Sequence, residues 1–254
     1  MSGLECLALV ALAFVLEVID ASFGMGYGTI LTPALLLFGY DPLRVVPAVI
    51  ASQLVGDFLA VFFHHRFKNV DMSAGSEHLR VGTTLAAFSL VGSVAAVLFA
   101  LKLSEFAFNL YIGVLVVIVG VVVLVTRDRQ RDFSWLRLLF LGSIASFNKG
   151  LSGGGYGPVV TGGQILTGVD VRAAIGITSL AEGVTCIAAV LTYLLAGKHV
   201  DWFLALMLAI GVGLSTPVAA LIVKRIQTKH LKSIIGVCTV IMGSLTLLKT
   251  VRIL

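Results

Sequence analysis

A glycine-rich run in the middle of the chain sets the strongest limit on how the chain can fold. Residues 149–158 read KGLSGGGYGP, and long apolar segments flank them on both sides. Five glycines and a proline within ten residues cannot continue a helix. In hydrocarbon, an opened backbone is tolerated only where it is buried in protein or lines a cavity. We therefore interpret this run as a break in a membrane helix at a binding site, not as a connecting loop.

The same break occurs a second time near the N-terminus, where residues 22–28 read SFGMGYG. Offsets of 129 and then 127 positions match the two parts of the chain at Gly24/Gly153, Gly26/Gly155, Tyr27/Tyr156, Gly28/Gly157, Thr32/Thr161, Gly39/Gly168, Asp41/Asp170, Ser52/Ser179 and Gly56/Gly183. Paired glycine-interrupted segments in a repeat indicate the binding site of a secondary transporter. The alternative is that the glycines only let helices pack closely in the bilayer. The tyrosine inside each glycine run favours the binding site.

The composition places these breaks in a membrane protein. Of the 254 residues, 58% are hydrophobic, and the mean hydropathy is +1.06. The apolar runs are long enough for membrane helices and too long for barrel strands. The net charge of +5 comes from basic residues that cluster between the apolar runs. This pattern indicates membrane orientation and not a nucleic-acid-binding patch.

Cysteine spacing and the N-terminal sequence lead to two further expectations. Cys6, Cys186 and Cys238 lie inside apolar runs without the spacing of metal ligands. We expect buried thiols, with no disulfide and no metal cluster. The first basic residue is Arg44, so the first apolar run lacks the basic segment of a cleaved signal peptide. We expect this run to belong to the mature protein.

Ten helices are predicted, arranged as two repeats of four long helices and one short helix each. The first repeat covers residues 1–126, a basic cytoplasmic linker covers 127–133, and the second repeat covers 134–254. The predicted helices are 4–21, 29–38, 42–63, 81–101, 106–126, 135–148, 159–166, 172–196, 202–223 and 231–251. Segments 29–38 and 159–166 are short, about half of the ~20 residues that cross a bilayer. The predicted fold class is an all-α polytopic membrane protein with glycine-rich helix breaks.

The basic loops predict how the repeats are oriented, because loops rich in Lys and Arg face the cytoplasm. Loops 64–80, 127–132 and 224–232 are therefore placed inside, and loops 102–105 and 197–201 outside. Loops 64–80 and 197–201 are equivalent in the repeat but lie on opposite sides, which predicts inverted repeats with both termini outside. Each first helix and its short partner then return to the same side. In the alternative, each first helix and the short helix after it form one broken span. The repeats are then parallel, and one strongly basic loop lies outside.

Charged residues beside the breaks are the first candidates for a site, because a central Lys or Asp costs roughly 2.5–3.5 kcal/mol on insertion scales. Lys149 directly precedes the second break, and Asp20 holds the equivalent position before the first. Opposite charges at equivalent positions indicate either a pair across the pseudo-twofold axis or an asymmetry around one site. The alternative is that Lys149 reaches an interface. However, about fourteen helical residues precede it, which is roughly 20 Å of rise.

Carboxylates inside two further predicted helices, Asp57 and Glu182, have the polar neighbours Ser52, Gln53 and Ser179. A spacing of four residues puts Gln53 and Asp57 on one helix face. Together with Asp20, these two carboxylates are the candidates for proton coupling. A structural role in helix packing is the alternative.

An anion fits the breaks, because opened backbone presents N–H groups and the restarting helix presents the positive end of its dipole. Hydroxyls that follow the breaks, from Thr29, Thr32 and Thr161, add donors. A cation site built from carbonyls and the three carboxylates is the alternative, and Lys149 argues against it. The predicted substrate-binding residues are Lys149, Asn148, Gly24, Gly26, Tyr27, Gly28, Thr29, Ser52, Gln53, Gly153, Gly154, Gly155, Tyr156, Gly157, Thr161 and Ser179.

Motifs of enzymes that use ATP or zinc do not occur in the chain. It contains neither G-x-x-x-x-G-K-[ST] nor H-E-x-x-H. We expect no ATP site, no metal, no cofactor and no enzymatic activity.

The region after the second break continues as Gly168…Asp170…Arg172-Ala173-Ala174…Gly176-Ile177-Thr178-Ser179. With two halves that each open on a glycine-rich break followed by a proline, the chain resembles the TauE/SafE sulfite-exporter family over essentially its whole length. The second motif is the more specific one, since Met25 stands where the first would have a glycine. The resemblance implies secondary transport of small sulfur-containing anions, sulfite and organosulfonates among them, across the bacterial inner membrane.

We therefore expect a multi-pass secondary transporter for a small oxyanion, sulfite in the first place, with proton coupling as an option. The alternatives are a passive anion channel and a transporter of organosulfonates or other small carboxylate anions. The expected partners are the anionic substrate and the lipid bilayer, with no nucleic acid. A small-residue face with Gly113 and Gly120 fits either a homodimer or packing within the chain.

Overall fold

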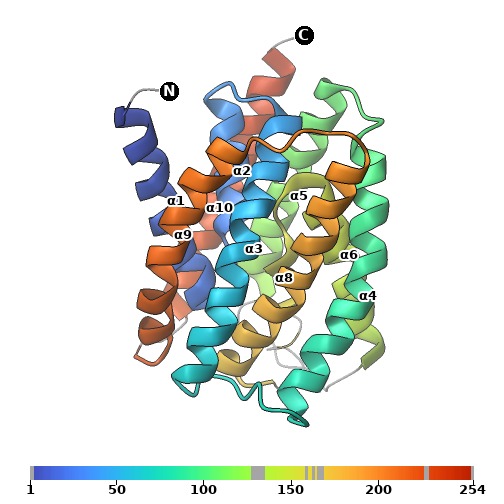
Figure 1. Ribbon diagram of the computed structural model, residues 1–254. Helices are drawn as coiled ribbons and strands as arrows, with labels where there is room; N and C mark the ends of the chain where they lie inside the picture. The colour runs from blue at the N-terminus through green and yellow to red at the C-terminus, as the bar shows by residue number, and fades with distance from the viewer. Residues whose placement is uncertain are drawn as a thin grey trace.

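The computed structural model describes residues 3–126, 135–157, 160–161, 164, 169–225 and 229–252, which form nine α-helices and no strand (Figure 1). The all-helical fold class is therefore confirmed. The predicted linker 127–133 and most of the predicted short helix 159–166 lie outside the described residues. The helices are α1 (Gly3–Phe23), α2 (Tyr27–Leu37), α3 (Pro42–Arg66), α4 (Glu77–Ala100), α5 (Glu105–Thr126), α6 (Trp135–Ser152), α8 (Val171–Leu195), α9 (Trp202–Val223) and α10 (Lys229–Arg252).

Five of these helices are long and apolar enough to cross a membrane, namely α1, α3, α4, α8 and α9. In α3 and α8, 67% and 72% of the most apolar segment is buried, against 39–44% in α1, α4 and α9. Helices α3 and α8 therefore form the centre of the bundle, and the other three expose more apolar surface to lipid. With 11 residues, α2 is too short to cross a bilayer alone.

Acidic caps start the two central helices. The Oδ1 atom of Asp41 accepts a hydrogen bond from Arg44 N at 3.1 Å, and Pro42 takes the first position of α3. Asp170 accepts two backbone hydrogen bonds at the start of α8 in the same way. Aspartate is a preferred N-cap residue, and proline suits the first helical turn. These caps agree with the predicted helix starts at residues 42 and 172 to within one residue.

Glycines with positive φ separate the helices at both predicted breaks. Between α1 and α2, φ is +64° at Gly24 and +134° at Gly26. After α6, φ is +75° at Gly153 and +79° at Gly155. Glycine adopts these conformations readily, whereas other residues do so at a cost. The helices are therefore interrupted at both places where the sequence predicts a break.

The main helix contacts all join the first part of the chain with the second. Helix α5 packs on α10, α1 on α9, and α4 on both α6 and α8, while α3 packs on both α8 and α9. Contacts within one part, such as those between α2 and α3, are smaller. The two parts are therefore interleaved and do not lie side by side as separate bundles.

Both chain ends and the α4–α5 and α8–α9 connections lie at one end of the bundle, at the top of Figure 1. The α3–α4 connection and the C-terminal end of α9 lie at the opposite end (Figure 1). Helix α1 starts at the upper end, and α2 returns to the same end (Figure 1). At the end of α2, Lys249 Nζ of α10 donates to the carbonyl oxygens of Leu36 and Leu37 at 2.8 and 3.0 Å. At the same end, Arg44 Nε lies 2.5 Å from Asp201 Oδ2 and ties α3 to α9.

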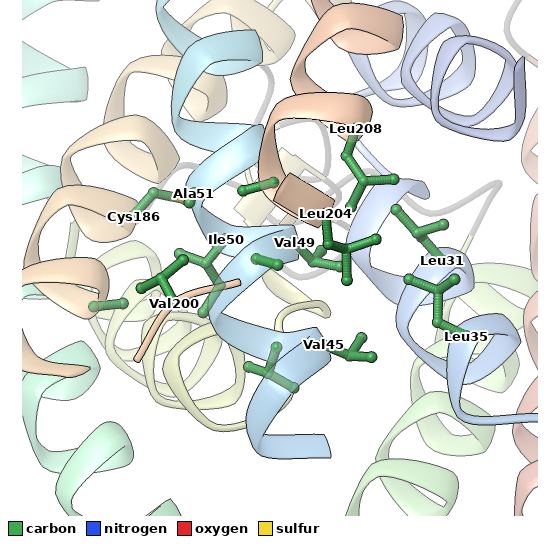
Figure 2. Close-up of a cluster of buried hydrophobic side chains, with 14 of the residues drawn as sticks. Leu31, Leu35, Val45, Val49, Ile50, Ala51, Cys186, Val200, Leu204 and Leu208 are labelled. Atoms are coloured by element: carbon green, nitrogen blue, oxygen red, sulfur yellow. The ribbon is translucent and has the colours of Figure 1, made fainter. Parts of the chain in front are cut away.

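Apolar side chains hold the short helix α2 in place. Leu31 and Leu35 of α2 belong to the same buried cluster as Val49 of α3 and as Leu204 and Leu208 of α9 (Figure 2). In a bilayer, where lipid is as apolar as leucine, close packing holds helices together more than the hydrophobic effect does. This cluster fixes α2 and, with it, the restart of the chain after the first break.

Candidate functional site

The two glycine-rich breaks cross each other inside the bundle, with backbone against backbone. A Cβ atom on Gly28 would overlap the carbonyl oxygen of Gly153, and one on Gly157 would overlap the carbonyl oxygen of Gly24. No side chain fits at these positions, so only glycine permits the crossing. The structure thus brings the two predicted halves of the site into direct contact.

Hydrogen bonds join the crossing breaks. Gly155 N donates to Thr29 Oγ1 at 2.9 Å, and Thr161 Oγ1 donates to the carbonyl oxygen of Gly24 at 3.1 Å. Both threonines are among the predicted site residues. Their hydroxyls bind the opposite break, so they fix the crossing in addition to any role toward a ligand.

Several backbone N–H groups of the breaks are already bonded within the protein. Those of Gly24 and Gly153 donate to the carbonyl four residues earlier, at 2.6 and 2.8 Å. The N–H of Tyr27, at the start of α2, donates to Asp20 Oδ1 at 3.1 Å. An acidic side chain therefore occupies the positive end of α2, where the sequence predicts an anion.

A buried ion pair lies beside the crossing. Lys149 Nζ is 2.9 Å from Glu182 Oε1, and the two side chains are 0% and 5% exposed. Gln53 joins them: its Nε2 donates to Glu182 Oε1 at 3.1 Å and to Asp20 Oδ2 at 3.2 Å, and its Oε1 accepts from Lys149. Lys149 and Asp20, at equivalent positions of the predicted repeat, are thus linked through Gln53.

Two further carboxylates, those of Asp20 and Asp57, lie close to the carboxylate of this ion pair. Asp20, Asp57 and Glu182 each offer one oxygen, and these three oxygens lie within 4.8 Å of one another. All three residues are buried. Asp57 Oδ2 accepts a hydrogen bond from the thiol of Cys186 at 3.6 Å, which is a weak donor. The predicted proton-coupling residues therefore form one cluster with Lys149.

A fourth carboxylate, that of Glu17, lies next to this cluster, one helical turn before Asp20. Glu17 is 1% exposed, and its Oε2 has no hydrogen-bond partner among the described residues. Its Oε1 lies 2.8 Å from where a Cβ on Gly56 would be. Glu17 is not among the predicted site residues, although its spacing of three from Asp20 puts both on one helix face.

The cluster holds more acidic groups than basic ones. Among the residues that the structure describes, four buried carboxylates, those of Glu17, Asp20, Asp57 and Glu182, lie in or beside the cluster, and Lys149 supplies one ammonium. Burying a charge without a partner is costly, so an excess of carboxylates requires protons or other cations to balance it. The arrangement is therefore suited to take up and release small cations.

The known proteins that the chain resembles agree with a transport site. The sequence pattern described as "Sulfite exporter TauE/SafE" matches residues 9–246. The chain belongs to the TauE/SafE family. It is 26% identical over 249 residues to the probable membrane transporter protein YtnM of Bacillus subtilis (strain 168), covering 91% of this chain and 79% of that protein. No solved structure matches. This TauE/SafE member is thus a multi-pass membrane transporter and not an enzyme.

A set of hydroxyl groups lines the crossing in this TauE/SafE member. Tyr27 and Ser52 share a hydrogen bond of 2.7 Å between their hydroxyls, and Tyr156 and Ser89 share one of 3.0 Å. The tyrosines inside the two glycine runs therefore each face a serine of a neighbouring helix. Ser89 is not among the predicted site residues, because a serine in an apolar helix carries no motif.

Two predicted site residues do not reach the charged cluster. Asn148 Oδ1 accepts from the Tyr111 hydroxyl of α5 at 2.6 Å, so it faces a neighbouring helix. The Ser179 hydroxyl donates to the carbonyl of Ile175 in its own helix at 3.1 Å. Gln164, which is not among the predicted site residues, donates from Nε2 to the Thr178 hydroxyl at 2.8 Å.

The side chains of Cys6 and Cys186 differ in burial. Cys186 is buried, as expected, whereas Cys6 is partly exposed, so the expectation of a buried thiol is wrong there. Cys6 lies in the first third of α1, a span with less than half of its apolar segment buried.

The small-residue face predicted around Gly113 and Gly120 contacts another helix of the same chain. Gly113 of α5 packs against Leu247 of α10, where a Cβ on the glycine would come within 2.7 Å of the leucine side chain. At Gly113, this face therefore serves packing within the chain.

Proposed function

We propose that this TauE/SafE member is a secondary transporter that moves a small sulfur-containing oxyanion, sulfite in the first place, across the bacterial inner membrane with proton coupling. The observation that carries this proposal is Lys149, which is fully buried at the crossing of two helix breaks. A buried ammonium beside opened backbone fits an oxyanion. The family description, sulfite exporter, supports the substrate class.

We also infer that the two halves are inverted repeats. The contacts of α1 with α9 and of α3 with α9 have counterparts in α6 with α4 and in α8 with α4. The close approach of Gly28 to Gly153 has its counterpart in that of Gly157 to Gly24, as a twofold axis between the halves requires. The connections α3–α4 and α8–α9, equivalent in the repeat, lie at opposite ends (Figure 1).

The charged cluster supports a link between anion and proton. Lys149 is held by Glu182, so an anion that approaches the ammonium competes with that carboxylate. Protonation of Glu182 or of its neighbour Asp57 removes negative charge from the cluster and frees Lys149 for the anion. Anion binding and proton uptake then favour each other, because the buried charges have to balance.

A passive anion channel is the second candidate, since crossing breaks lined by hydroxyls also suit a narrow pore. Purified protein in liposomes separates the two. A transporter saturates with sulfite, shows counterflow and moves sulfite when only a pH gradient is imposed. A panel of sulfite, sulfate, an organosulfonate and a small carboxylate ranks the substrates. Sulfite flux without saturation or counterflow would contradict secondary transport, and a strong preference for another anion would contradict the substrate.

A further inference from the structure

The carboxylate cluster lies where two broken helices end. Helix α1 ends three residues after Asp20, and α6 ends three residues after Lys149. The C-terminal end of a helix carries partial negative charge. In transporters with discontinuous helices, such ends bind the coupling cation, either Na⁺ or a proton. Beside Asp20, the backbone and the side chains therefore both favour positive charge.

A buried carboxylate oxygen at this place lacks a protein partner. Glu17 Oε2 is buried and makes no hydrogen bond among the described residues. The other oxygen of Glu17 lies against Gly56, the residue before Asp57. An ionised carboxylate left without a partner in the protein interior is costly. This oxygen indicates a positively charged ligand that the described residues do not supply.

The spacing of the oxygens fits an ion larger than Mg²⁺. Oxygens from Asp20, Asp57 and Glu182 lie within 4.8 Å of one another. An ion equidistant from three oxygens at that limit would be about 2.8 Å from each, and closer oxygens shorten this distance. Mg²⁺ needs about 2.0–2.1 Å in a near-octahedral shell, which this spacing does not favour.

The neighbouring ammonium decides the charge of the ion. Lys149 lies 2.9 Å from Glu182, so an ion held by the same carboxylate is repelled by it. This repulsion is twice as large for a divalent ion as for a monovalent one. Ca²⁺ also takes six to eight oxygens, and the cluster offers three carboxylates with Glu17 beside them.

We infer that Asp20, Asp57 and Glu182, with Glu17 beside them, form a binding site for a small monovalent metal cation of the sodium class. Na⁺ and protons then compete for the same carboxylates. The inference rests on the proposed function, since the cation balances the charge of the anion at the crossing. It names a second ion that this site can use in place of a proton.

The test is a titration of the full-length protein in lipid nanodiscs at one mildly alkaline pH, with choline chloride keeping the ionic strength constant. NaCl is expected to raise the melting temperature and to saturate, because an ion that binds the folded state stabilises it. KCl is expected to have no such effect. Radiolabelled sodium measures the binding directly. Glu17→Gln and Asp57→Asn are each expected to weaken Na⁺ binding about tenfold or more, through loss of one charged contact.

Glu77→Gln is the matched control, because it neutralises an exposed glutamate at the start of α4. It is expected to leave the Na⁺ titration unchanged. A wild-type protein that responds equally to NaCl, KCl and choline chloride would overturn the inference, and so would saturable binding of Ca²⁺ but not Na⁺. Sodium binding that persists unchanged in both Glu17→Gln and Asp57→Asn would also overturn it.

Anion flux in liposomes separates this inference from the proposed function. Proton-driven sulfite flux in a protein that binds no Na⁺ leaves the proposed function standing and removes the sodium site. Sodium binding in a protein that moves none of the tested anions supports the sodium site and contradicts the proposed function.

Discussion

Lys149 and Glu182 form an ion pair of 2.9 Å in which the two side chains are 0% and 5% exposed. Removing one partner of such a pair leaves the other charge buried and alone, which costs about 3–5 kcal/mol. Lys149→Ala is therefore expected to lower the free energy of unfolding by this amount. The double variant Lys149→Ala/Glu182→Gln is expected to regain most of the loss, as measured by thermal unfolding in detergent. Equal melting temperatures for the single and double variants would count against the pair.

The same double variant tests the anion role of Lys149, because it removes the ammonium without leaving an unpaired carboxylate. Charge-assisted hydrogen bonds contribute roughly 1.5–3 kcal/mol each. The apparent affinity for sulfite in liposomes is therefore expected to fall about ten- to a hundredfold. Glu182→Gln alone keeps the ammonium and serves as the comparison. If the double variant binds sulfite as tightly as the wild type, Lys149 does not contact the anion.

Asp57 is the carboxylate of the cluster with the weakest hydrogen-bond donor, the thiol of Cys186 at 3.6 Å. The proposed proton coupling therefore assigns the transported proton to Asp57 first. Asp57→Asn is expected to abolish sulfite uptake driven by a pH gradient, while exchange of sulfite for sulfite continues. Both fluxes are measured in the same liposomes. Uptake driven by pH at the wild-type rate would show that Asp57 does not carry the proton.

Gly28 and Gly157 are expected to tolerate no side chain. A Cβ at either position overlaps a carbonyl oxygen of the opposite break, and backbone cannot move aside as a flexible side chain can. Gly28→Ala and Gly157→Ala should each abolish transport or lower the yield of folded protein to a similar degree. Gly3→Ala is the control, since a Cβ there meets nothing within 4 Å. Normal transport by either variant would contradict the crossing.

Sidedness can be measured with single cysteines in a background without native cysteines. The α8–α9 connection, which contains Lys198, and the α3–α4 connection, which contains Ser73, lie at opposite ends of the bundle (Figure 1). A membrane-impermeant thiol reagent is expected to label Lys198→Cys from outside the cell and Ser73→Cys only after the membrane is opened. Labelling of both from one side would contradict the inverted repeats.

The breaks could be predicted from the sequence because glycine has a distinctive backbone. Five glycines and a proline between apolar runs have few structural solutions in a membrane, and the structure opens the chain at both runs. Helix starts at Asp41 and Asp170 were predictable for a similar reason, since a cap is a local feature of the chain.

The partners of the charged residues were not predictable, because they depend on how helices pack. Lys149 and Asp20 hold equivalent positions, yet Gln53 of α3 lies between them and Glu182 of α8 takes the ammonium. Asn148, one residue from Lys149, points about 100° away around the helix and meets Tyr111. Glu17 lies one helical turn before Asp20 in the sequence, but only the three-dimensional structure shows that its Oε2 has no hydrogen-bond partner among the described residues.

The interleaving of the two parts of the chain has a consequence for biosynthesis. Helices α1, α3, α4 and α5 are made first, and the helices against which each of them mainly packs are α6, α8, α9 and α10. Glu17, Asp20 and Asp57 are synthesised before Lys149, whose ammonium joins their cluster in the folded protein. The first half therefore cannot form its main helix contacts until the second half has been synthesised.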